Sequence, residues 1–336
     1  MNKKEGIMPR YFYSIYGPSI CDFLSLKRSL GFKYHAGEYE LGKLDKIAHE
    51  REESSIGITR ELANIVGAKQ LNESDKSRVN RIQIIRQFAF FLNNTGHPSH
   101  VPDMPSFKSS YTPYIFTQEE ILRLLKVCDG IKTPIKNPNT GMFFLPVLIR
   151  LLYATGIRVG EAMSLAISDV DVELGHLKVR DSKNGKQRLI PFMPSMALVL
   201  QDYLKYRSQR PVLKGVDHLF VNPAGTIPSH YIAYKWFRRI LFKAGISHGG
   251  RKAGPRLHDF RHTFAVHSLA ALSQKGVDLY YSLPILSTYL GHQSLSATDK
   301  YVRLTAEMYP SIIAGVNKIC PHIFPDHSKT DSYETD

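Results

Sequence analysis

The amino-acid sequence predicts a mainly α-helical protein with a small antiparallel β-sheet, built as two domains joined by a linker. Apolar residues recur at helical spacing through most of the chain. Two alternating segments, 174–179 and 187–192, flank Asn184-Gly185, the strongest short signal for a β-hairpin. Residues 94–116 are rich in Pro, Ser and Gly and lack periodicity, as expected between domains.

The first domain, residues 1–105, is predicted to be a small helical bundle. Apolar residues recur at helical spacing over 20–30 and 41–47, and Gly31 ends the first of these helices. A longer stretch, 76–94, has its apolar residues on one face and arginines on the rest. Such a basic helix can lie along a phosphate backbone, or it can be a solvated face.

The second domain is predicted over residues 117–320, after a linker at 106–116. Thr117 begins it, because Glu120 completes a capping box at the start of an amphipathic helix. After the hairpin, helical periodicity returns near residues 195–206, 229–243, 259–273, 283–290 and 296–315. The polar residues 321–336 are predicted to be a disordered tail.

Composition and charge narrow the function classes. The 336 residues are 43% hydrophobic and 22% charged, as in globular proteins, and no segment approaches the ~18 to 20 apolar residues of a membrane helix. The three cysteines have no disulfide or zinc-ligand spacing, and the N-terminus lacks a secretory signal, so we expect a cytoplasmic protein. The chain has 44 basic and 30 acidic residues, and this basic excess is concentrated in residues 106–325. Such an excess favours a polyanionic partner.

Two segments of the second domain offer cations to an anion. Arg158 follows a Thr-Gly turn at a helix start, where free backbone N–H groups already favour negative charge. Glu161 shares its helical face and can orient it. The tight hairpin turn presents Lys183 or Lys186 toward a ligand. A basic run between residues 238 and 256 is interpreted as a surface that faces phosphates.

Two further segments offer groups that titrate. His258 and Arg261 stand at i and i+3 on one helical face, and His292 lies nine residues before Tyr301. Together the four segments supply arginines, a lysine, histidines and a tyrosine, without a carboxylate cluster that would hold Mg²⁺. Such a set suits metal-free phosphoryl transfer to a tyrosine nucleophile.

At these residues the chain resembles the tyrosine recombinase (phage integrase) family. The family's TGxRxxE segment places its arginine on Arg158, and its hairpin lysine falls on Lys183 when RLIPF is aligned with the family's strand. Its H-x-x-R box matches residues 258–261, which are followed by His-Thr-Phe-Ala. Its L-G-H box matches residues 290–292, and its tyrosine falls on Tyr301 at the same offset.

The resemblance covers about residues 20 to 315 and implies a helical core-binding domain followed by a catalytic domain. It implies a site-specific recombinase or integrase that cuts and rejoins DNA through a covalent 3′-phosphotyrosine, without metal, ATP or another cofactor. Residues 270–287 form a longer stretch than in compact Xer-type proteins and resemble integrases of transposons and other mobile elements.

The resemblance also assigns roles at the reacting phosphate. Tyr301 is expected to attack it, while Arg158 and Arg261 hold its non-bridging oxygens. His292 is expected to add a hydrogen bond. The expected partners are double-stranded DNA with two recombination sites, three further copies of the chain in a homotetramer on DNA, and a possible directionality factor.

Proton transfer is expected from two other residues. The resemblance implies His258 as general base toward the tyrosine and Lys183 as general acid toward the departing 5′-oxygen, with Lys186 as the alternative acid. His258 and His262 stand at i and i+4, but the glutamate of H-E-x-x-H is absent and Arg261 would repel a cation. We therefore expect no zinc site and interpret His262 as a packed structural residue.

Two other functions fit the same residues. One is a tyrosine-type DNA topoisomerase, which would relax supercoils as a monomer. The other is a non-catalytic DNA-binding accessory protein of the same fold. The sequence does not specify the DNA target, because base readout depends on how side chains are placed in a groove.

Overall fold

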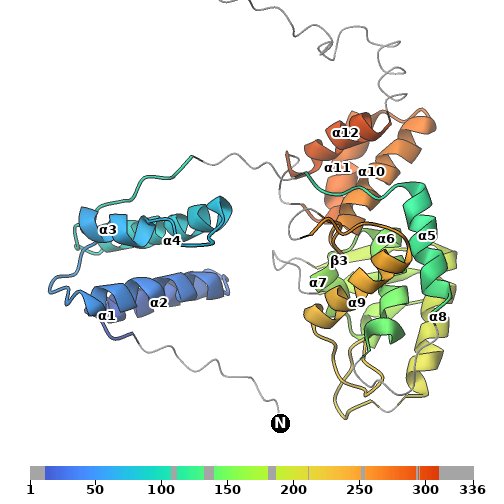
Figure 1. Ribbon diagram of the computed structural model, residues 1–336, viewed down its shortest axis with the longest axis horizontal. Coiled ribbons are helices and arrows are strands. Elements are labelled where there is room, and N and C mark those ends of the chain that lie inside the picture. The colour runs from blue at the N-terminus through green and yellow to red at the C-terminus, as the bar shows by residue number, and fades with distance from the viewer. Residues whose placement is uncertain are drawn as a thin grey trace, which may run out of the picture. The chain divides into compact units, whose positions relative to one another are not determined.

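The chain divides into two compact units, Met1–Tyr111 and Thr112–Asp336, which are described separately (Figure 1). The computed structural model describes residues 12–106, 112–131, 140–180, 187–210, 212–250, 254–292, 294 and 296–309. Both units are mainly helical and the second contains a small antiparallel sheet, which confirms the predicted fold class. Among these residues, no helix is both long and apolar enough to cross a lipid bilayer.

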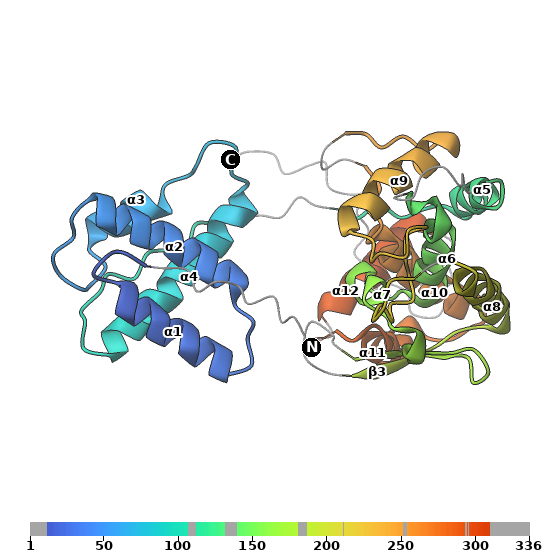
Figure 2. The same ribbon diagram turned by 90° about the horizontal axis from the view of Figure 1, so that it is seen from below.

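Within its described residues, 12–106, the first unit is a bundle of four helices. They are α1 (Gly17–Ser29), α2 (His35–Glu50), α3 (Arg60–Gly67) and α4 (Asp75–Asn94). Helix α4 crosses α2 (Figure 2), and the apolar faces of the helices enclose a core that includes Phe23 and Phe88. The short helix α3 was not predicted from periodicity. It is capped locally, since the Thr59 hydroxyl accepts a hydrogen bond from the Leu62 N–H at 3.1 Å.

The second unit contains eight α-helices within the described ranges. They are α5 (Gln118–Asp129), α6 (Leu145–Thr155), α7 (Val159–Met163), α8 (Pro194–Ser208), α9 (His230–Lys243), α10 (Asp259–Gln274), α11 (Leu279–Leu290) and α12 (Ser296–Met308). The predicted capping box is present, because Thr117 and Glu120 exchange side-chain to backbone hydrogen bonds at the start of α5. Two short 3₁₀ helices, Gly141–Phe143 and Ile167–Asp169, lie before α6 and before the sheet.

The predicted hairpin is the main part of a three-stranded antiparallel sheet. Its strands are β1 (Val170–Asp171), β2 (His176–Val179) and β3 (Arg188–Pro191), in that order. Val179 pairs with Arg188 where β2 and β3 approach the hairpin turn. The turn itself, residues 181–186, lies outside the described residues. Strand β1 was not predicted, because two residues are too few to establish an alternating pattern.

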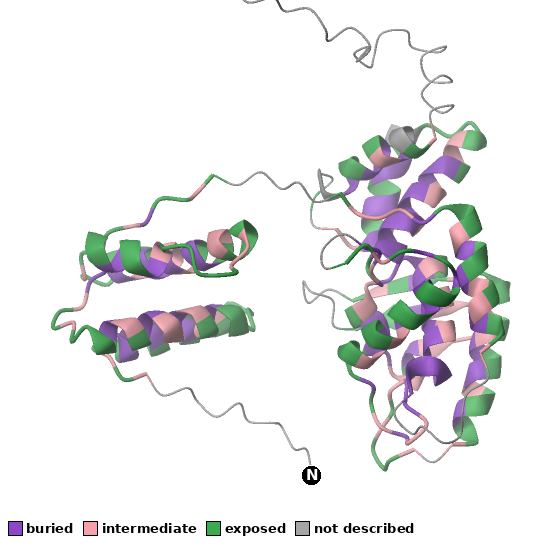
Figure 3. Ribbon diagram, in the orientation of Figure 1, coloured by how far each residue is buried: buried purple, intermediate pink, exposed green. Residues whose placement is uncertain are grey.

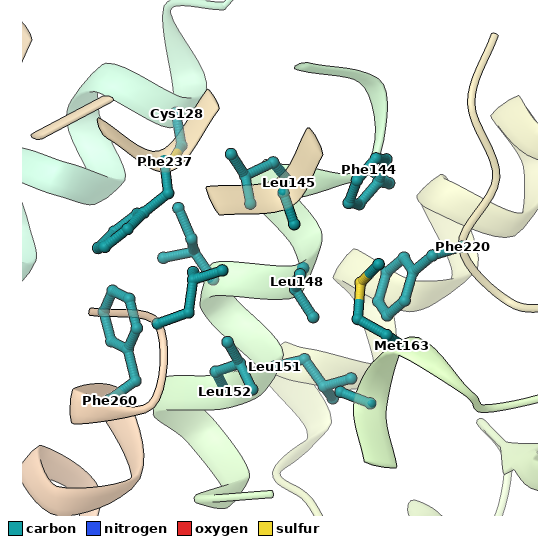
Figure 4. Close-up of a cluster of buried hydrophobic side chains, with 14 of the residues drawn as sticks. Cys128, Phe144, Leu145, Leu148, Leu151, Leu152, Met163, Phe220, Phe237 and Phe260 are labelled. Atoms are coloured by element: carbon teal, nitrogen blue, oxygen red, sulfur yellow. The ribbon is translucent and has the colours of Figure 1, made fainter. Parts of the chain in front are cut away.

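Helix α6 lies at the centre of the main hydrophobic core. Its leucines, including Leu148, lie between Phe237 and Phe260 on one side and Phe144 and Phe220 on the other (Figure 4). Colouring by burial shows the same arrangement, with buried residues on the inner faces of the surrounding helices (Figure 3). This core fixes the end of α6, from which the candidate site is built.

Helix α10 takes part in two hydrophobic clusters. At its start, Phe260 packs in the main core and stacks on Phe116 with ring centroids 4.8 Å apart. Further along, Val266 and Leu269 pack against α11 and α12 in a second cluster, which also contains Tyr301. The start of α10 is therefore held between both clusters, and its polar residues are placed where the clusters meet.

Replacing Leu148 by alanine is predicted to destabilise the second unit. Leu148 is fully buried, so the substitution leaves a cavity in the core and should lower the free energy of unfolding by about 2–5 kcal/mol. Urea denaturation measures the change. The matched control is Leu122→Ala, because Leu122 is 66% exposed. This substitution should lower the free energy of unfolding by no more than about 0.5 kcal/mol. Equal effects of the two variants would contradict this description of the core.

Candidate active site

A glycine turn at the end of α6 places Arg158. Gly156 has φ of +59°, and a Cβ at this position would lie 2.4 Å from the Phe264 ring, so both backbone and space require glycine. Helix α7 begins immediately afterwards. The Arg158 backbone N–H donates to Glu161 Oε2 at 3.1 Å, which caps the helix and places both side chains on one side, as predicted.

The Glu161 carboxylate is shared by two arginines. Arg158 Nη1 donates to its Oε1 at 2.8 Å, and Arg188 donates to both oxygens, at 3.1 Å and 2.6 Å. Burial alone would raise the pKa of Glu161, but hydrogen bonds from Arg188 and Arg158 outweigh it and hold the pKa below its ordinary value. The carboxylate is therefore ionised at neutral pH.

Arg261 joins the α6 turn to the end of α11. Its Nη1 donates to the Gly156 carbonyl at 2.9 Å, and its Nη2 donates to the Leu290 carbonyl at 2.6 Å. Arg158 Nη2 donates to the next carbonyl along the chain, that of Gly291, at 3.1 Å. Burial, followed by the charge of Arg158, lowers the pKa of Arg261 to about 10, so the Arg261 guanidinium is still charged at neutral pH.

Two predicted histidines stand beside these arginines. The His292 Nδ1 is hydrogen-bonded to Thr298 Oγ1 at 2.7 Å. His258 immediately precedes α10 and is exposed on one side. For both rings, packing of protein atoms around them, and then the charges of Arg261 and Arg158, lower the pKa to about 4. Both imidazoles are therefore uncharged at neutral pH, and the arginines carry the positive charge.

The Tyr301 side chain is buried between two histidines. It is 1% exposed, and its hydroxyl is hydrogen-bonded to His262 Nδ1 at 2.8 Å. Its ring stacks on His292, with centroids 6.1 Å apart and planes 22° from parallel. Burial raises the pKa of Tyr301 to about 12, although the charge of Arg261 and a hydrogen bond from it oppose this. The phenol is therefore protonated in this structure.

His262 is buried, as predicted, and it also has a polar role that the sequence did not reveal. Its ring lies 5.0 Å from that of His258, edge to face. Burial, with the positive charge around it, lowers the pKa of His262 to about 3. The imidazole is therefore uncharged at neutral pH, and the Tyr301 phenol is protonated. The pair is therefore a neutral hydrogen bond that holds the phenol in place.

The structure brings together most of the predicted set. Five of its six members surround one location: Arg158, His258, Arg261, His292 and Tyr301. Lys183 and its alternative Lys186 lie outside the described residues, so the hairpin lysine stays a prediction. Arg188 and His262 are additional members. Both lie in segments that the resemblance matches, Arg188 in RLIPF and His262 directly after the H-x-x-R box, but only their long-range hydrogen bonds reveal that they belong to the site.

A hollow next to α9 carries much of the basic run. It measures about 750 Å³, and Arg238, Arg239 and Lys243 line it together with aromatic side chains such as Tyr234 and Phe242. The Arg239 guanidinium lies over the Trp236 ring at 4.2 Å. This combination of cations and aromatic rings is suited to a phosphate-bearing polymer. Arg251 and Lys252, which belong to the same run, lie outside the described residues.

Comparison with known proteins links this geometry to one family. The phage integrase family matches residues 115–308. Tyrosine recombinase XerC of Oceanobacillus iheyensis is 30% identical over 241 residues, which cover 70% of this chain and 72% of XerC. Tyrosine recombinase XerD of Listeria monocytogenes is 29% identical over 258 residues, which cover 74% and 79% of the two chains.

Two solved structures share the fold. The Tn1549 transposon integrase in complex with transposon right end DNA matches with a TM-score of 0.60 at 17% identity, covering 88% of this chain and 99% of that one. A lambda integrase dimer bound to a COC′ core site matches with a TM-score of 0.58 at 17% identity, covering 84% and 94%.

His262 is predicted to make folding stability depend on pH. Its pKa falls from 6.5 to about 3 on folding, so the unfolded chain binds more protons between these values. The free energy of unfolding should therefore decrease as the pH falls through this window, by up to about 1.4 kcal/mol per pH unit from this group. Asparagine can replace Nδ1 but cannot be protonated, so His262→Asn should flatten the dependence. Urea denaturation from pH 7 to pH 3 measures it. An unchanged slope in the variant would contradict the assignment.

Proposed function

The chain belongs to the phage integrase family of tyrosine recombinases, and we propose that it cuts and rejoins DNA through a covalent 3′-phosphotyrosine intermediate without metal or ATP. One observation carries the proposal. The guanidinium groups of Arg158 and Arg261 are fixed by consecutive backbone carbonyls, and Tyr301 and His292 lie beside them. This is a site for one phosphate next to one nucleophile.

The chemistry is a pair of matched displacements. The Tyr301 oxygen attacks phosphorus, the bond from phosphorus to the 5′-oxygen breaks, and a 3′-phosphotyrosine forms. Arg158, Arg261 and His292 donate hydrogen bonds to the non-bridging oxygens, where charge increases in the transition state. A 5′-hydroxyl from another strand then attacks the phosphotyrosine and releases Tyr301. The phosphotyrosine conserves the bond energy, so each exchange needs no outside energy source.

Proton transfer accompanies each displacement. His258 accepts the tyrosine proton, since its ring is uncharged at neutral pH and the residue is exposed directly before α10. Lys183 on the hairpin gives a proton to the departing 5′-oxygen, with Lys186 as the alternative. The same groups act in reverse during rejoining.

Tyr301 must move before it can react. At 1% exposure its hydroxyl is inaccessible to a DNA phosphate, and its hydrogen bond to His262 has to break. We propose that DNA binding shifts α12, on which Tyr301 lies, and transfers the hydroxyl from His262 to the phosphate. The DNA-free chain would then keep its nucleophile protonated and covered.

The substrate is double-stranded DNA with two recombination sites, bound in the cytoplasm by a homotetramer. Residues 1–105 form a core-binding domain and residues 117–320 a catalytic domain, and both bind the duplex. The basic surface of α9, with Arg238 and Arg239, contacts DNA in this arrangement. Residues 305–316 dock on a neighbouring copy in the tetramer, and a directionality factor can select the direction of the reaction.

Covalent adduct formation tests the proposed mechanism. Purified protein is incubated in EDTA with nicked DNA that spans the junctions flanking its gene, and a protein–DNA band is sought after denaturation. The wild-type chain should form the adduct, whereas Tyr301→Phe should bind the DNA in a gel shift but form none. Tyr309→Phe, in the same hydrophobic cluster, is the matched control and should keep the adduct. Specific binding without any wild-type adduct would favour the non-catalytic alternative.

A plasmid assay separates recombinase from topoisomerase. A plasmid with two copies of the bound site should give recombinant products. Relaxed plasmid alone would identify a topoisomerase.

Removing the chain beyond Arg303 is predicted to prevent tetramer assembly on DNA, because the segment that docks on a neighbour is lost. Native gel electrophoresis and light scattering of the protein–DNA complex measure its stoichiometry. Tetramers formed by the shortened chain would exclude a docking role for residues 305–316.

A further inference from the structure

Arg188 on β3 reaches the proposed phosphate site from the strand that follows the hairpin turn. Its side chain is only 13% exposed, and it holds Glu161 in a two-pronged ion pair, with nitrogen–oxygen distances of 3.1 Å and 2.6 Å. An arginine and a carboxylate joined in this way are fixed in orientation as well as in distance. Arg188 is therefore a fixed part of the site.

The position of Glu161 creates an electrostatic problem that Arg188 resolves. The carboxylate is 5% exposed and contacts Arg158, one of the two arginines that face the proposed phosphate. A single buried carboxylate on a single arginine would cancel most of the charge that the arginine offers to an anion. Arg188 supplies a second cation to the same carboxylate, so Arg158 retains charge for the phosphate.

The hydrogen bonds of Arg158 leave some of its N–H groups available for a phosphate. Its backbone N–H and Nη1 bind Glu161, and its Nη2 binds the Gly291 carbonyl. A guanidinium has five N–H groups, so donors remain for an anion, and the Arg158 side chain is 22% exposed. Arg188, by contrast, directs both terminal nitrogens at Glu161, and its buried Nε has no hydrogen-bond partner among the described residues.

Arg188 also supports the loop that carries His292. Its guanidinium lies so close to Gly291 that a Cβ there would be 3.3 Å from Nη1 and 3.4 Å from Cζ. Gly291 has φ of +67°, and its carbonyl accepts the hydrogen bond from Arg158. One side chain thus contacts both the carboxylate and the loop that orient Arg158.

We propose that Arg188 is a positioning residue for DNA cleavage, which neutralises Glu161 so that the charge of Arg158 acts on the reacting phosphate. This inference rests on the proposed function. In the attack by tyrosine, the phosphate gains negative charge between the bound state and the transition state. Loss of a unit of positive charge next to Arg158 should therefore slow the reaction more than it weakens DNA binding.

Two substitutions separate charge from geometry. Arg188→Gln removes the charge, whereas Arg188→Lys keeps it and loses the two-pronged geometry. At saturating nicked DNA, the single-turnover rate of adduct formation should fall by about 10- to 100-fold for the glutamine variant and by only a few-fold for the lysine variant. DNA affinity should change by less than about threefold in both. Equal decreases in rate for the glutamine and lysine variants would show that Arg188 acts through the geometry of its ion pair and not through its charge, and would overturn the proposal.

A second substitution at Glu161 gives the sharpest test. Glutamine at position 161 can still cap α7 but has no charge to neutralise. The double variant Glu161→Gln/Arg188→Gln should therefore form the adduct faster than Arg188→Gln alone, by at least about threefold. A double variant as slow as or slower than the single one would overturn the proposal. If Arg188→Gln does not fold, the double variant is compared with Glu161→Gln alone. A much lower rate of adduct formation in the double variant than in Glu161→Gln would likewise overturn the proposal.

Arg180 provides the matched control. It stands next to β2 and forms an ion pair with Asp169, away from Glu161. Arg180→Gln removes the same charge and one ion pair from the same hairpin, and should leave the single-turnover rate within about twofold of wild type. A loss as large as that of Arg188→Gln would overturn the specific role of Arg188. Absence of an adduct with wild type, by contrast, would contradict the proposed function itself.

Discussion

The buried guanidinium of Arg261 connects the three segments from which the site is built. It lies in the first turn of α10 and donates to the carbonyl of Gly156 and to that of Leu290. These acceptors close the end of α6 and the end of α11, so the side chain fixes the start of α7 and the loop before His292 at once. Because the charge is 2% exposed, its hydrogen bonds have to be nearly complete to offset the cost of burial. The packing of α10 between two hydrophobic clusters keeps this geometry in place.

Burial divides the electrostatic roles in the site. It lowers the pKa values of His258, His262 and His292 far enough that none carries a charge at neutral pH, whereas Arg261 remains charged even at a pKa of about 10. The permanent charge therefore comes from guanidinium groups, which bind phosphate in a planar, two-pronged manner. The imidazoles stay free to donate and accept protons.

Tyr301, the proposed nucleophile, combines two properties that DNA cleavage would require at different times. In the DNA-free chain it is a core residue of the α10–α12 cluster, covered and protonated, with its hydroxyl satisfied by His262. The charges of Arg261 and Arg158 already act to lower the pKa of its phenol, but burial prevails. Exposure of the phenol beside the arginines would remove burial, which raises its pKa, and would leave the charges of Arg261 and Arg158, which lower it. The location that protects the phenol is thus next to the location that activates it.

The sequence alone determined the helical class, the β2–β3 hairpin, the capping box at Thr117, and the motifs that contain five of the site residues now seen together. These features are local, because helical periodicity, caps and turns depend on residues a few positions apart. The tertiary structure alone decided that Arg188 meets Glu161, 27 positions away, and that His262 meets Tyr301, 39 positions away. It also decided which histidine contacts the phenol, because His258 and His262 are one helical turn apart and both lie about 40 positions before Tyr301 in the sequence. Packing of helices selects such pairs, and their energies depend on burial that no local pattern records.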